Sequence, residues 1–231
     1  MAQLFFGGDG SPQDVIQFLG RQEKHWKEKF SAYETACSWF DAEGLRPAIQ
    51  SLLQTDSTFA DAKLSKAYFE RSTELDDFRR SPSQTDVLAF VHISSGLGVL
   101  GVEGKVNESF GQIVSDWNDY SPGKLRRLAG LIERLGLRPS VKLGSLRYQL
   151  FHRTVATILE AQRANARDAA MVVQSFSPDD VRTGFKDFQD FASALGMSIP
   201  EPGKLSEPLR SGDVRLRLGW AVSPMRSVGK A

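Results

Sequence analysis

A nearly continuous apolar run over residues 87–93 constrains the fold of this chain more than any other feature. A turn containing serine and glycine follows at 94–98, and a second apolar run follows at 99–106. Two such runs joined by a short link with glycine predict a β-hairpin. The first run is apolar on both faces, and His92 within it is expected in the core. The hairpin should therefore lie at the centre of a sheet that is covered on both sides.

Helix and strand patterns flank the hairpin. Apolar spacing and Ser/Pro start signals predict seven helices. The first starts near 11–12, and the others cover 26–40, 47–53, 109–118, 122–135, 145–163 and 178–195. Further strands are predicted over 62–68, 170–176 and 213–222. The last of these should turn Arg215 and Arg217 toward solvent. This order predicts an α/β (α+β) fold with a small mixed central sheet, built on the hairpin and flanked by helices.

Length and composition fit a single domain over residues 1–231. Its core should cover about 20–176, followed by a helix and strand at 177–222 and a frayed tail at 223–231. A net charge of +1 argues against a polybasic nucleic-acid binder. One cysteine, Cys37, and three dispersed histidines exclude a Cys/His zinc site. Without an apolar membrane span or a secretory signal, a cytoplasmic location and no membrane partner are expected.

Three charged residues of the hairpin form the candidate chemical site. Asp86 opens the first strand, and Glu103 and Lys105, two residues apart, share one face of the second. A two-residue turn at 95–96 would place Asp86 opposite Lys105. Two carboxylates suit Mg²⁺, which keeps water and phosphate oxygens in the rest of its shell. Gly104 has no side chain, so a helix or a ligand should approach the strand closely there.

An ordinary ion-pair cluster is the alternative explanation of these three charges. A carboxylate two positions before a lysine arises about once or twice by chance at this composition. The sequence contains a second example, Asp61-Ala62-Lys63. The position at the end of a buried hairpin is what favours a functional site.

These residues resemble the signature of the PD-(D/E)XK nuclease superfamily. Thr85-Asp86 precedes a strand, a turn and Glu103-Gly104-Lys105, although Thr85 stands where the signature has proline. The resemblance covers roughly residues 20–176 and implies a restriction-endonuclease-like fold. It implies that Asp86 and Glu103 bind Mg²⁺ or Mn²⁺ and that Lys105 is the catalytic lysine.

The same resemblance implies helper residues on the neighbouring helices. Glu34 would complete the metal site, and Gln149, with Tyr148 and His152, would assist. Two of these have a structural alternative: Glu34 fits a capping box with Ser31, and His152 suits a partly buried structural histidine. The wider text around 31–34, 83–86 and 147–150 is similar to a bacterial family assigned to the superfamily, for which no substrate is implied.

The first functional hypothesis is a Mg²⁺-dependent nuclease acting on DNA or RNA. Arg126, Arg127 and Arg134 would border the nucleic-acid groove, or else form a solvated helix face. A non-catalytic domain of the same fold that binds nucleic acid or protein is the second hypothesis. The third is an unrelated α+β interaction module with structural acids. The oligomeric state stays open.

Overall fold

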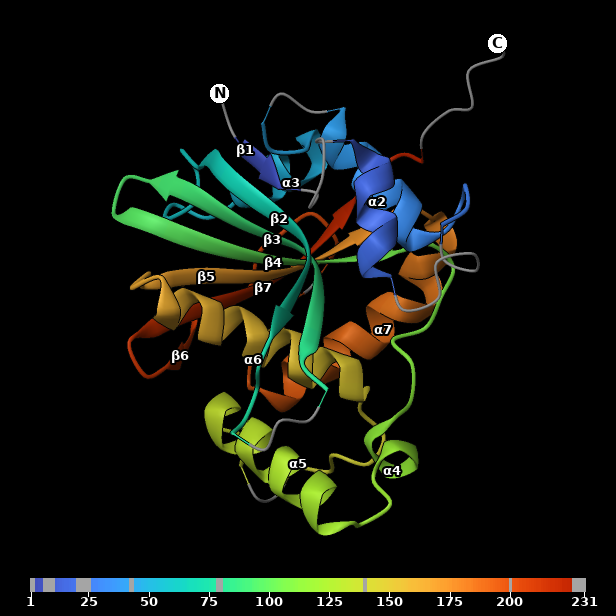
Figure 1. The fold of residues 1–231 in the computed structure, drawn as a ribbon. Helices are drawn as coiled ribbons and strands as arrows, with labels where there is room; N and C mark the ends of the chain where they lie inside the picture. Colours follow the sequence, from blue (N-terminus) through green and yellow to red (C-terminus); the bar gives the residue numbers. More distant parts are fainter. Residues whose placement is uncertain are drawn as a thin grey trace.

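The computed structural model describes residues 3–5, 11–19, 26–41, 44–77, 81–138, 141–199 and 201–225. The strands of this described part form one mixed sheet in the order β1-β2-β3-β4-β5-β7-β6 (Figure 1). Their bounds are β1 Gln3–Phe5, β2 Lys63–Thr73, β3 Ser83–Ile93, β4 Gly96–Lys105, β5 Asp168–Ser175, β6 Leu209–Ser211 and β7 Val214–Val222. Strands β2, β3 and β4 are antiparallel neighbours, whereas β5 and β7 continue parallel to β4. The expected α+β class and mixed sheet are confirmed.

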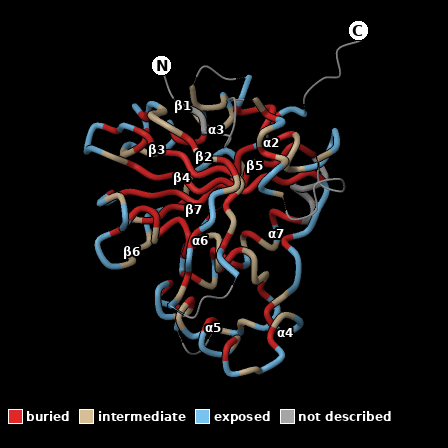
Figure 2. The backbone as a smooth tube through the Cα atoms, viewed as in Figure 1, coloured by how far each residue is buried: buried red, intermediate tan, exposed pale blue. Residues whose placement is uncertain are grey.

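Helices cover both faces of the sheet (Figure 1). On one face lie α6 (Tyr148–Arg163) and α7 (Pro178–Ala194), with α5 (Pro122–Leu135) packed against α6 and the short α4 (Val114–Trp117) nearby. On the other face lie η1 (Pro12–Phe18), α2 (Ser31–Phe40) and α3 (Pro47–Leu53). Two hydrophobic cores result, one on each face, and the central strands between them are buried along most of their length (Figure 2).

The hairpin forms as predicted, but its register differs by two residues. Ile93 pairs with Gly96 and Val87 with Val102, so Asp86 lies across from Glu103 rather than Lys105. The two turn residues are Ser94 and Ser95 rather than Ser95 and Gly96. Gly96 is the first residue of β4 and has a φ of +125°, which glycine adopts easily. His92 is exposed, contrary to expectation, because its side chain points to the face opposite that of its buried neighbours Val91 and Ile93.

Two glycines of β4 allow helices to approach the strand from opposite faces. A Cβ on Gly101 would lie 2.0 Å from Oγ1 of Thr157 in α6. A Cβ on Gly104 would lie 2.0 Å from Oγ1 of Thr35 in α2. The expected close approach at Gly104 is therefore confirmed, and β4 is held between two helices.

Several helix boundaries differ from the predictions. The helix predicted over 26–40 begins only at Ser31, after a turn in which Lys29 has φ of 66°. The helix predicted over 109–118 is reduced to α4. By contrast, α5 has the predicted bounds, and Gly136 ends it in the left-handed conformation with φ of 62°.

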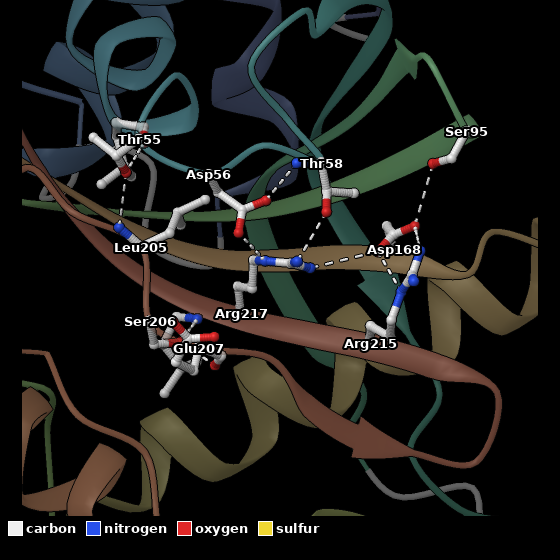
Figure 3. A network of polar contacts seen from close by, with 12 residues as sticks. Thr55, Asp56, Thr58, Ser95, Asp168, Leu205, Ser206, Glu207, Arg215 and Arg217 are labelled. Atoms are coloured by element: carbon white, nitrogen blue, oxygen red, sulfur yellow. Dashed lines mark hydrogen bonds and ion pairs between the residues drawn. The ribbon is translucent and has the colours of Figure 1, made fainter.

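Strand β7 is largely buried, and the predicted solvent-facing side is wrong for Arg217, whereas the Arg215 side chain is 39% exposed. Arg217 is buried and donates to Asp56 at 2.7 Å and to Thr58 at 2.9 Å, and it approaches Asp168 at 3.4 Å (Figure 3). Arg215 binds the same Asp168 at 2.5 Å. The loop after α3 contacts Arg217 through Asp56 and Thr58, so Arg217 neutralises Asp56 and Asp168 instead of meeting water. Arg215 pairs with Asp168 but stays partly exposed.

The C-terminal region belongs to the central sheet rather than to an appendage. β7 pairs along the length of β5. The predicted start of the frayed tail at 223 is too early. The Ser223 amide still donates to the Ser175 carbonyl at 2.7 Å. Residues 226–231 lie outside the described part. No helix among the described residues is both long enough and apolar enough to cross a bilayer.

Gly104→Ala should destabilise the protein by about 1–3 kcal/mol, since the new methyl group would collide with Thr35. Adding Thr35→Ala should recover much of this loss. The Thr35 hydroxyl makes no hydrogen bond in the described structure, so its removal breaks none. Urea unfolding of the single and double variants measures both effects.

Gly130→Ala is the matched control, because a Cβ there would meet nothing within 4 Å in the middle of α5. Helix propensity predicts a gain of roughly 0.5–1 kcal/mol. Equal stability of Gly104→Ala and the unaltered protein would show that α2 does not press on β4 as described.

Candidate functional site

A polar cleft of about 270 Å³ opens where β3 begins and β4 ends. Four residues expected at the site from the sequence line it together: Asp86, Glu103, Lys105 and Gln149. Other lining residues come from β2, β3 and α6: Glu70, Gln84 and Arg153. Glu108, just after β4, also lines the cleft and lies 3.8 Å from Lys105 Nζ. The cleft therefore gathers four carboxylates, two cations and two amides.

Glu103 is the most heavily engaged carboxylate of the cleft, although only 3% of it is exposed. Its Oε1 accepts from Lys105 Nζ at 3.1 Å and from Gln149 Nε2 at 2.6 Å. Its Oε2 accepts from Arg153 Nε at 2.5 Å. Burial opposes its ionisation, but the charges of Arg153 and Lys105 outweigh burial and lower the pKa of Glu103 below the ordinary value.

Asp86 has a different environment although it lies beside Glu103. Its Oδ2 accepts from the Gly104 amide at 2.8 Å, and its Oδ1 is 3.9 Å from Arg153 Nη2. Burial, and then the negative charge of Glu103, raise the pKa of Asp86 to about 7. The two carboxylates thus differ in how readily they ionise, as acids that share one site usually do.

Glu70 is a third carboxylate at the cleft, and sequence reasoning missed it. Its neighbours in β2, Phe69 and Arg71, pair with Val87 and Thr85, so Glu70 lies across from Asp86. Burial, and then Asp86, raise the pKa of Glu70 well above the ordinary value. The strand predicted over 62–68 ended too early to include it. Glu70 has a φ of 51°, which is uncommon for a residue other than glycine. Such backbone conformations occur more often at functional sites than elsewhere.

Arg153 was also missed, although its spacing was visible. It lies four residues after Gln149 and therefore on the same face of α6. Besides Glu103, it donates from Nη1 to Ser83 Oγ at 3.1 Å. The resemblance had drawn attention to Tyr148, Gln149 and His152 instead.

Glu34 lies elsewhere in the structure. Its Oε1 accepts from the Lys29 amide at 2.9 Å, and it does not line the cleft. Phe30, not Ser31, is the N-cap of α2, so the predicted capping box does not form as written. Glu34 still binds backbone at this helix start, which accounts for its burial.

The three arginines predicted to border a groove do not form one surface. Arg127 is buried, donating to Asp76 at 2.9 Å and to the Ser81 carbonyl at 2.7 Å. Arg126 and Arg134 are exposed on α5, and none of the three lines the cleft. Helical spacing placed Arg127 and Arg134 on one face, but the segment before β3 covers only the first of them.

The carboxylates of the cleft suit a divalent cation that keeps several water ligands better than one coordinated by protein side chains alone. No three His, Cys, Asp or Glu side chains of the described residues are arranged to hold a metal ion. Mg²⁺ needs only one or two carboxylates and fills its shell with water and phosphate oxygens. Asp86 and Glu103 supply such a pair in a polar space large enough for several waters.

Comparison with known proteins gives a family but no activity. A family model described as a domain of unknown function, DUF6946, matches residues 10–225. The chain belongs to the DUF6946 family. No curated protein and no solved structure matches it. For this DUF6946 chain, function must therefore be inferred from the cleft itself.

The raised pKa of Asp86 predicts that ionisation of this one carboxyl destabilises the metal-free DUF6946 domain as pH rises from about 4 to 7. In this window the unfolded chain releases the Asp86 proton at its ordinary pKa of 3.8, whereas the folded protein keeps it until about 7. Asp86→Asn removes this penalty, so the variant should exceed the unaltered protein in stability at pH 8. The gain should be a few kcal/mol and should shrink toward pH 5.

Urea unfolding in the presence of a chelator, at pH 5 and pH 8, measures this difference. Asp213→Asn, at an exposed turn, is the control and should change stability little at either pH. A gain for Asp86→Asn that is the same at both pH values would contradict the raised pKa.

Proposed function

We propose that this chain is a Mg²⁺-dependent phosphodiesterase that cleaves nucleic acid, a nuclease of the PD-(D/E)XK type. The observation that carries the proposal is the convergence of Asp86, Glu103 and Lys105 on one cleft from two paired strands. The element order supports it: α2 precedes the strands β2, β3 and β4, and α6 then leads to β5 parallel to β4. A restriction-endonuclease-like core is expected to have this order.

Asp86 and Glu103 are the residues that would hold the ion. When bound, it would act as a Lewis acid on the phosphate and make a water nucleophilic near neutral pH. Glu70, Asp86 and Glu103 form a row across three strands in which burial and neighbouring carboxylates oppose the ionisation of Glu70 and Asp86. A divalent cation bound there would offset this repulsion and favour the ionised forms.

Lys105 is placed to act on the reacting phosphate. Its Nζ lies 3.1 Å from Glu103 Oε1 and 3.1 Å from Gln149 Oε1, which hold the ammonium at the wall of the cleft. An ammonium fixed there would orient the attacking water or neutralise charge that develops on the phosphate. Gln149 donates to Glu103 and accepts from Lys105, so it positions both groups.

The competing function is a non-catalytic domain of the same fold that binds nucleic acid or protein. One observation favours it: both oxygens of Glu103 already accept hydrogen bonds from this chain. For an ion to bind Glu103, Arg153 must release or share Oε2. If Arg153 never leaves, Glu103 and Arg153 are a structural ion pair.

Isothermal titration with Mn²⁺ should show one divalent ion bound to the unaltered protein and loss of binding in Asp86→Asn. Asp213→Asn, which removes an exposed carboxylate away from the cleft, should bind as the unaltered protein does. Arg153→Met should bind Mn²⁺ more tightly, because it removes a cation that competes for Glu103. Titrations of Asp86→Asn and the unaltered protein that coincide would remove the metal site and favour the binding domain.

Lys105→Ala should lower the cleavage rate by about 10²- to 10³-fold, the loss typical of one preorganised electrostatic group. Nucleic-acid affinity should change little. Stability should also persist, since Arg153 still neutralises Glu103. Cleavage of plasmid and single-stranded DNA with Mg²⁺ or Mn²⁺, together with thermal melting, measures these effects.

A purely structural Lys105 would have the opposite profile. Its loss would leave buried carboxylates with less positive charge nearby, and stability would drop by a few kcal/mol. An early-melting variant of a protein that cuts no nucleic acid would end the nuclease proposal.

A further inference from the structure

A second cavity, of about 520 Å³, lies beside the cleft on the other side of the first turns of α6. We call this cavity the aromatic pocket. Five of its lining side chains are aromatic or cationic: Trp117, Lys124, Arg127, Tyr148 and His152. They belong to α4, α5 and α6, and the segment before β3 closes one wall. Tyr148, His152 and Arg127 were expected to serve the nuclease site, but they line this separate pocket instead.

Two aromatic side chains of the pocket stack on each other, and a third, His152, is tilted by 49° from Tyr148. The rings of Trp117 and Tyr148 stack with centroids 3.7 Å apart and planes 11° apart. The His152 ring lies 5.1 Å from Tyr148, and its Nδ1 is 2.9 Å from Ser83 Oγ. Stacked aromatic rings at a cavity wall suit a planar ligand such as a nucleobase.

The two cations of the pocket retain donors that the protein does not use. Lys124 Nζ donates to the Trp117 carbonyl at 2.6 Å and lies 3.2 Å from Asp119. It also lies over the Trp117 ring, 5.3 Å from its centroid, so one of its three hydrogens is held only by this weaker contact. Arg127 is only 8% exposed and engages Asp76 and the Ser81 carbonyl through Nε and Nη1. Its Nη2 is buried and has no partner in good hydrogen-bond geometry, although a side-chain contact with the Tyr148 hydroxyl helps to raise the pKa of Arg127. Unused donors on cations suit an anionic group such as a phosphate.

The pocket and the cleft share one wall. Tyr148 and His152 line the pocket, whereas the next residues of the same helix, Gln149 and Arg153, line the cleft. Ser83 Oγ contacts both His152 and Arg153. A nucleic-acid strand that passes over the start of α6 would therefore contact both the aromatic pocket and the cleft.

We propose that the aromatic pocket binds one unpaired nucleotide, with its base against Trp117 and Tyr148 and its phosphate at Lys124 and Arg127. The inference rests on the proposed function in one respect: the nucleotide belongs to the strand whose phosphodiester reaches Asp86 and Glu103. A base inside this pocket is not paired, so the protein selects single-stranded segments or frayed ends over intact duplex. A free mononucleotide has the same chemistry and is the other source of such a ligand.

Fluorescence anisotropy with labelled single-stranded and duplex oligonucleotides tests the pocket in the presence of a chelator. Binding is then measured without metal or cleavage. Trp117→Ala should weaken single-strand binding roughly five- to hundredfold, the loss expected for one stacked base. Trp117→Phe, which keeps a stacking ring, should restore much of it. Lys124→Gln should also weaken binding and lower the salt slope by about one.

Two matched controls separate the pocket from general surface effects. Tyr120→Ala removes a nearby aromatic ring that is 72% exposed, and Lys142→Gln removes an exposed lysine outside the pocket. Both should bind as the unaltered protein does. Competition by adenosine or thymidine monophosphate distinguishes the sources. Weak competition by the mononucleotide supports a nucleic-acid strand as the ligand. A mononucleotide that binds as tightly as the oligonucleotide overturns the strand as the ligand.

Unchanged single-strand affinity in both Trp117→Ala and Lys124→Gln would overturn the pocket, whether or not the protein cleaves. Conversely, reduced binding in these variants with no cleavage at any metal concentration would sustain the pocket and end the nuclease proposal. The two failures therefore remain distinct.

Discussion

The buried charge of Glu103 is the constraint on which the site and much of the packing depend. A carboxylate on a central strand would be costly to bury alone, so it requires cations. Lys105 supplies one from the same strand, and Arg153 supplies the other from α6. The second contact ties the first turns of α6 to the end of β4. These cations let Glu103 ionise readily, whereas burial, and then the negative charge of Glu103, oppose the ionisation of Asp86.

The packing of β4 makes this arrangement possible. Gly101 admits α6 on one face, and Gly104 admits α2 on the other, so the strand that carries Glu103 and Lys105 has little freedom to shift. At the other end of the sheet, Arg217 and Asp168 form a second set of buried charges that joins β7 and β5 to the loop after α3 (Figure 3). Both ends of the sheet are thus held by paired charges, and the end that carries Glu103 opens into the polar cleft.

Helix α6 gives the molecule its functional asymmetry. Consecutive residues of its first turns face two cavities with different chemistry, an acidic cleft and an aromatic pocket with cations. Divalent ions and phosphodiesters suit the first, and unpaired bases suit the second. A near-neutral net charge is compatible with this arrangement, because the attraction for nucleic acid would arise locally and not from the whole surface.

Sequence alone determined the hairpin, the bounds of α5 and the grouping of Asp86, Glu103 and Lys105, because these follow from local periodicity, turn chemistry and short spacing. It did not reveal Glu70 or Arg153, which reach the cleft through the pairing of β2 with β3 and the docking of α6 on β4. It also misplaced Arg127 and Arg217, which look like surface residues until another segment covers them. Only the tertiary structure decided these positions, because burial and charge pairing depend on which distant segments meet, and local patterns do not encode that.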